Sequence, residues 1–118
     1  SEYRYSNLQL ATPTLAQGQT ALLSVDVENS GPRAGVEIVQ VYVSDLVTSA
    51  TWVNKALKGF ARVHLEPGEK KTVQFELPWQ SFQIVDVQGS NVVEPGDFEI
   101  LVGPSSRDSD LLKVTLRI

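Results

Sequence analysis

The sequence predicts an all-β fold, a sandwich of two antiparallel sheets built from seven strands. Apolar and polar residues alternate in short runs, which is the period of a half-buried strand. Gly and Pro separate these runs at regular intervals, as at Gly31-Pro32, Pro67-Gly68 and Pro95-Gly96. No segment keeps a helical period over about ten residues. Two stacked sheets joined by turns account for all three observations.

We expect the strands at residues 5–10, 20–29, 36–45, 57–65, 70–77, 97–103 and 109–118. Their inward rows are Leu8 and Leu10; Leu23, Val25 and Val27; Val39, Val41 and Val43; Val73, Phe75 and Leu77; Phe98, Ile100 and Val102; and Leu112, Val114, Leu116 and Ile118. Rows of this kind interdigitate between sheets about 10 Å apart. The long connection at 78–96 is expected to hold one helical turn near Pro78 and a small hairpin around residues 88–90.

Two strands depart from simple alternation. In the third, Ile38 and Tyr42 lie opposite the valine row, so the outer face is partly apolar. This indicates either a strand under a long loop or a surface that docks another domain, and we favour docking. Phe60 falls on the outer side of the next strand. Either Gly59 supports a bulge that turns Phe60 inward, or Phe60 lies under a loop or a partner.

Composition limits the classes of function. At 118 residues the chain forms one domain, residues 1–118, with enough surface to bury for one core. The net charge of −4 argues against a nucleic-acid partner, and no apolar run reaches the length of a membrane span. The absence of Cys excludes disulfides, thiolate catalysis and Cys-based zinc sites. Because the chain lacks Met and opens on SEYRYSNL, we expect it to be a piece of a longer protein.

No catalytic or metal-binding constellation stands out. Glu94, Asp97 and Glu99 cluster in sequence, but the first two flank a Pro-Gly turn and the third lies on an outer strand face. Glycoside hydrolysis requires two carboxylates on opposite sides of a sugar, and a solvated turn does not supply them. His64 is the single histidine and stands on a strand beside Arg62. We therefore expect no catalytic residue, no metal and no cofactor in this chain.

The two tryptophans are candidates for binding and not for catalysis. Trp52 lies in the loop between the third and fourth expected strands, and Trp79 follows Pro78. An exposed indole can stack on a sugar ring or anchor a protein interface. The alternative for each is that it caps one end of the sandwich core.

Several ordered motifs span nearly the whole chain. They are Tyr5-Ser6-Asn7-Leu8, Val27-Glu28-Asn29-Ser30-Gly31, Val39-Gln40-Val41-Tyr42-Val43-Ser44-Asp45, Leu57-Lys58-Gly59-Phe60, Leu65-Glu66-Pro67-Gly68-Glu69 and Glu94-Pro95-Gly96-Asp97-Phe98. Together they resemble the C-terminal fibronectin type III-like domain of family 3 glycoside hydrolases, the β-glucosidases and β-xylosidases. The resemblance implies a fibronectin type III or immunoglobulin-like sandwich. It also implies that the chemistry belongs to other domains of the parent chain, a barrel with an Asp nucleophile and a neighbour that supplies the acid.

The hypothesis that follows is a non-catalytic, stabilising domain of a family 3 glycoside hydrolase. By itself the chain is not expected to be an enzyme, whereas the parent is expected to hydrolyse O-glycosyl bonds. Its partners would be the catalytic domains of the same chain. The candidate contacts are Trp52, Lys55, Lys58 and Phe60, with Ile38 and Tyr42 beside them. The alternatives are an independent carbohydrate-binding module that uses Trp52 and Trp79, and a generic protein-interaction sandwich.

Overall fold

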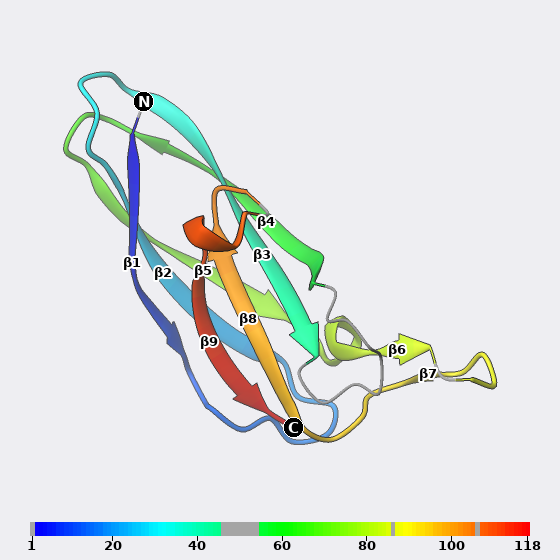
Figure 1. Ribbon diagram of the computed structural model, residues 1–118. Coiled ribbons are helices and arrows are strands. Elements are labelled where there is room, and N and C mark those ends of the chain that lie inside the picture. The colour runs from blue at the N-terminus through cyan, green and yellow to red at the C-terminus, as the bar shows by residue number, and fades with distance from the viewer. Residues whose placement is uncertain (1, 46–54, 86, 106) are drawn as a thin grey trace.

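The computed structural model describes residues 2–45, 55–85, 87–105 and 107–118. Two antiparallel sheets lie one over the other, with the strand orders β1-β2-β5 and β4-β3-β8-β9 (Figure 1). The first sheet contains β1 (Tyr3–Leu10), β2 (Ala21–Asn29) and β5 (Lys70–Leu77). The second contains β4 (Lys55–Leu65), β3 (Gly35–Asp45), β8 (Asp97–Gly103) and β9 (Leu112–Arg117). These are the strands of the predicted sandwich, so the expected fold class is confirmed.

The connection from β5 to β8 also has its predicted contents. A 3₁₀ turn, η1 (Trp79–Phe82), begins directly after Pro78. The strands β6 (Ile84–Val85) and β7 (Asn91–Val92) then pair as a short hairpin that extends away from the sandwich (Figure 1). Before β9, a second 3₁₀ turn, η2 (Asp108–Asp110), follows β8. In the described part of the chain no helix is long and apolar enough to cross a membrane.

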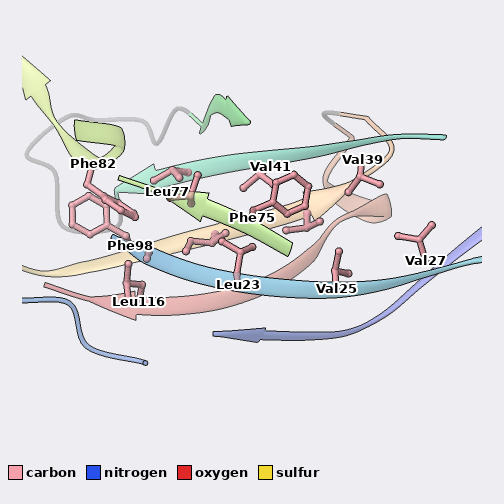
Figure 2. Close-up of a cluster of buried hydrophobic side chains, with 14 of the residues drawn as sticks. Leu23, Val25, Val27, Val39, Val41, Phe75, Leu77, Phe82, Phe98 and Leu116 are labelled. Carbon is pink, nitrogen blue, oxygen red and sulfur yellow. The ribbon is translucent and has the colours of Figure 1, made fainter. Parts of the chain in front are cut away.

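The core lies between the two sheets and is made by the predicted rows. Figure 2 shows these side chains converging from both layers, including Val25 from β2 and Val41 from β3, neither of which is exposed. At one end the rings of Phe82 and Phe98 pack edge to face, with their centroids 5.3 Å apart. Removal of one large aliphatic side chain from water contributes roughly 1.5–3 kcal/mol before conformational entropy is subtracted. The inward rows are therefore the main source of stability, as the alternation predicted.

One predicted row is only half-buried because its strand is irregular. Leu8 and Leu10 pack against the core from β1 but keep part of their surface exposed. Between Ser6 and Gln9 the pairing with β2 shifts register, and Asn7 has a φ of 55°. An asparagine tolerates this left-handed backbone better than most residues. After β1 the chain crosses to the other sheet, where the Leu15 N–H donates to the Arg117 carbonyl at 2.8 Å.

Two polar links between described residues join the sheets. Asn29 of β2 is fully buried, and its amide nitrogen donates to the backbone carbonyls of Arg33 at 2.7 Å and Leu65 of β4 at 3.1 Å. Its amide oxygen accepts from the Gly31 N–H at 2.9 Å. Because each hydrogen-bonding atom of the amide is paired, its burial costs little and fixes the turn after β2 against β4.

The second link joins Tyr5 of β1 to Glu37 of β3. Glu37 is half-buried and takes the inward position of β3 that precedes Val39. The Tyr5 hydroxyl donates to its carboxylate at 2.8 Å. Burial, together with this hydrogen bond, raises the pKa of Tyr5, so the phenol stays protonated as a donor. The hydrogen bond from Tyr5 of one sheet thereby offsets part of the cost of burying the Glu37 carboxylate of the other.

The core assignment predicts that Val41→Asp unfolds the isolated chain. A carboxylate at this fully buried site has no partner, which costs on the order of 4 kcal/mol, a large part of the stability of a small domain. The matched control is Ile38→Asp on the outer side of the same strand, which should fold. Thermal melting followed by circular dichroism checks both variants. A Val41→Asp melting curve that overlays that of the unsubstituted chain would refute the assignment.

The Asn29 bonds predict a large loss for Asn29→Asp. The carboxylate cannot donate to the carbonyls of Arg33 and Leu65, so buried acceptors face a buried charge. We expect a loss of about 3 kcal/mol in the free energy of unfolding, measured by urea titration. Asn91→Asp makes the same chemical change on the exposed β7 and should stay within about 0.5 kcal/mol. Equal urea midpoints for the two variants would contradict the role given to the Asn29 amide.

Candidate functional site

The outer face of β3 and β4 carries large apolar side chains exposed to solvent. In the antiparallel register Val36 lies opposite His64, Ile38 opposite Arg62, and Tyr42 opposite Leu57. The exposed fractions are 48% for Val36, 37% for Ile38, 53% for Leu57 and 66% for Phe60. We call these four residues the outer apolar strip. Contiguous apolar surface of this kind on a folded domain marks a contact region more often than a scattered single residue does.

The position of Phe60 depends on a bulge in β4. Val41 pairs with Gly59 and Tyr42 with Leu57, so Lys58 is the extra residue of β4. A β-carbon built on Gly59 would lie 3.9 Å from the Phe75 ring, so Gly59 faces the core. Phe60 therefore takes the next, outward position. A bulge is present, as one alternative required, but the expectation that it turns Phe60 inward is wrong because the extra residue precedes Gly59.

Part of the outer face of this sheet is covered by the chain itself. Tyr42 is only 9% exposed and packs with Leu101 of β8 and Leu111. Its hydroxyl donates to the side-chain oxygen of Gln40, whose amide nitrogen donates to the Pro104 carbonyl at 3.1 Å. The described residues of the β8–β9 connection, 104–105 and 107–111, thus fold back over the sheet. Tyr42 was predicted beside Ile38 on a docking surface, and it lies on that face but under this connection.

Close packing at Gly103 lets the connection approach the sheet. A β-carbon on Gly103 would lie 2.7 Å from the Asp110 carbonyl oxygen and 2.8 Å from a Leu111 methyl carbon, closer than real side chains come. Only a residue without a side chain fits at this point of β8. The chain therefore has a built cover for the β8 side of the outer face, whereas the outer apolar strip on the β3–β4 side has none among the described residues.

The other predicted contact residues divide into three groups. Lys58 is exposed beside the strip. Trp79 of η1 is half-buried and packs against the core, so the capping interpretation of this indole is the one that the structure supports. Trp52 lies outside the described residues, and Lys55 is described only by its backbone, which pairs with Ser44 at the start of β4. The structure thus brings Ile38, Lys58 and Phe60 together.

Sequence reasoning missed two members of the outer apolar strip. Val36 continues the outward row of Ile38 by one step, so a longer count of the alternation would have included it. Leu57 could not be found that way, because alternation counted back from Phe60 gives Leu57 an inward position. The bulge at Lys58 reverses the face of every residue before it.

The outer face of the other sheet, formed by β1, β2 and β5, is mostly polar, and its Asp26 carboxylate is bound by neighbouring side chains. Asp26 of β2 accepts a hydrogen bond from Thr72 at 2.7 Å and one from Asn7 at 3.4 Å, and Lys70 lies 4.0 Å away. The hydrogen bond from Thr72 is the main cause that lowers the pKa of Asp26. A hollow of about 480 Å³ between these three strands is lined by polar residues such as Gln9 and Gln74 as well as by apolar ones.

The described residues contain no arrangement suited to catalysis or metal binding. No group of three or more His, Asp or Glu side chains in this part of the chain could hold an ion. Glu94 is exposed before β8, and Asp97 and Glu99 follow on that strand. The exposed His64 has its Nε2 3.2 Å from the Glu66 carboxylate. What the arrangement offers is a surface for contact.

Comparisons with known proteins agree with this architecture. Residues 37–106 match the fibronectin type III-like domain family. The chain is 41% identical over 116 residues to a β-xylosidase of Formosa agariphila and 40% identical over 119 residues to thermostable β-glucosidase B of Acetivibrio thermocellus. These matches span 98% and 100% of this chain, respectively, but only 16% of the length of each enzyme.

A solved structure gives the same result in three dimensions. The chain superposes with a TM-score of 0.89 and 43% identity on a β-glucosidase involved in saponin metabolism from intestinal bacteria, over 99% of this chain and 16% of that one. The protein is a member of the fibronectin type III-like domain family, of the kind carried by family 3 β-glucosidases and β-xylosidases. The predicted resemblance is confirmed. The relatives are about six times longer than this chain, so most of each relative lies outside the matched region.

Proposed function

We propose that this chain is a non-catalytic accessory domain that packs against the catalytic domains of a family 3 β-glycosidase and stabilises them. The observation that carries the proposal is the outer apolar strip on β3 and β4. An apolar strip left exposed costs free energy that its burial under a neighbouring domain recovers, at roughly 25 cal/mol per Å². The parent enzyme would hydrolyse O-glycosyl bonds with residues of its other domains.

Two features support docking through this face. The described residues of the β8–β9 connection already cover the β8 side of this face, so apolar side chains on the outer face of the same sheet are buried where the chain supplies a cover. The matched enzymes devote about 16% of their length to this region, which leaves a large remainder of the chain to supply the cover. The exposed Lys58 extends the proposed contact along β4, and contact through Lys55 and Trp52 stays a prediction.

The alternatives have less support. A carbohydrate-binding module would need exposed aromatic rings, and Trp79 instead packs against the core. Tyr3 and Tyr5 line a second hollow of about 210 Å³, but the Tyr5 hydroxyl is already bonded to Glu37. A generic interaction module would also use the strip, yet the relatives named above are glycosidases that contain this domain within one chain.

The test is Phe60→Ser in the full-length enzyme that contains this domain. If the strip is buried there, loss of the ring removes roughly 1–3 kcal/mol of docking and lowers the melting temperature of the enzyme by several degrees. In the isolated chain the same change should leave melting nearly unaltered, because Phe60 is already 66% exposed.

Leu22→Ser is the matched control for Phe60→Ser. Leu22 is 46% exposed on the outer face of the other sheet, opposite Glu76 of β5. It should behave alike in the isolated chain and in the full-length enzyme. If Phe60→Ser and Leu22→Ser shift the melting of the full-length enzyme equally, docking through the strip is wrong.

A further inference from the structure

The charged residues at the outward positions of β3 and β4 have one sign. By the strand register, the outward positions of β3 and β4 hold no acidic residue, although the chain carries 14 acidic residues and a net charge of −4. The basic residues at these positions are Arg62, opposite Ile38, His64, opposite Val36, and Lys55, opposite Ser44, of which only the backbone is described. The exposed Lys58 lies in the bulge next to Leu57. An acidic domain therefore presents a locally basic face.

Two of these cations have no partner within the described residues. His64 has Glu66 at 3.2 Å, but neither Arg62 nor Lys58 makes an ion pair in the part of the chain that the structure describes. On the other sheet, by contrast, the outward Lys70 lies 4.0 Å from Asp26, and the neighbouring Lys71 lies 3.9 Å from Glu69. An unpaired cation also occurs on the other sheet, since the exposed Arg4 of β1 makes no ion pair within the described residues. What distinguishes the β3–β4 face is that its unpaired cations lie beside exposed apolar side chains.

A cation beside an apolar contact limits what can cover it. When a surface closes over Ile38 and Phe60, the guanidinium of Arg62 loses part of its water, which is unfavourable unless an anion replaces it. Arginine pairs with carboxylates through two parallel hydrogen bonds, so a carboxylate is the fitting counter-group. A basic covering surface would instead add repulsion between like charges.

We propose that the surface covering the outer apolar strip is an apolar patch bordered by carboxylates, which pair with Arg62 and Lys58. This inference rests on the proposed function, since the occupant is the catalytic part of the same parent chain. The apolar centre supplies most of the docking energy, and the two cations fix the orientation of the domain on its partner. The pairing makes the attachment sensitive to ionic strength.

The experiment is Arg62→Glu in the full-length enzyme, melted at about 0.01 M and about 0.5 M salt. Charge reversal brings like charges together, so we expect a fall in melting temperature on the order of 5 °C at low salt and a smaller fall at high salt. Arg62→Lys should retain most of the stability. Arg4→Glu makes the same reversal on the exposed β1 of the other sheet and is the matched control.

The outcomes separate this inference from the proposed function. If Arg62→Glu and Arg4→Glu shift melting equally at both salt concentrations while Phe60→Ser still destabilises the full-length enzyme, docking stands and the acidic border is wrong. If Phe60→Ser has no effect beyond that of Leu22→Ser, the proposed docking is wrong. A rise in melting temperature for Arg62→Glu would mean that the covering surface is basic and would also overturn the inference.

Discussion

The rest of this structure depends on the packing of apolar side chains from β2, β5, β3 and β8 between the two sheets. Because side chains alternate along a strand, burial of Val25, Val41 and Ile100 fixes the face of each neighbouring residue. The outward apolar residues of β3 cannot move into the core without removing the inward valines. They are therefore committed to the outer surface, where the cover must come from the β8–β9 connection or from another domain.

This constraint links the fold to the proposed function. Tyr42 is an outward apolar residue that the chain itself covers, since Leu101 and Leu111 bury it. Ile38 and Phe60 are outward residues that no described segment of the chain covers, so another domain would have to cover them. The polar outer face of the other sheet, where Asp26 is held by Thr72 and Asn7, needs none. The two outer faces thus differ in apolar exposure, and on the face formed by β3 and β4 the unpaired Arg62 and Lys58 border the exposed apolar strip.

The sequence predicted most of the fold because strand alternation is a local signal. The seven sandwich strands, the 3₁₀ turn after Pro78 and the following hairpin are present as predicted, but the last strand begins at Leu112 and not at residue 109, because η2 occupies Asp108–Asp110. What it could not predict depends on pairing between distant strands. Lys58 is an extra residue only relative to its pairing partner β3, so the alternation within β4 alone could not give the outward face of Leu57. The burial of Tyr42 requires Leu111 of the β8–β9 connection to fold back over it. The roles of Asn29 and Glu37, polar residues at inward positions, are also clear only when Leu65 and Tyr5 are brought beside them.

The central claim is that the outer apolar strip is exposed in the isolated chain and buried in the full-length enzyme. Hydroxyl-radical footprinting of both forms measures this directly, with Phe82, which is buried in the core, and Leu22, which is exposed on the other sheet, as internal references. The account predicts that labelling of Phe60 falls toward that of Phe82 in the full-length enzyme while labelling of Leu22 is unchanged. Equal labelling of Phe60 in both forms would contradict it.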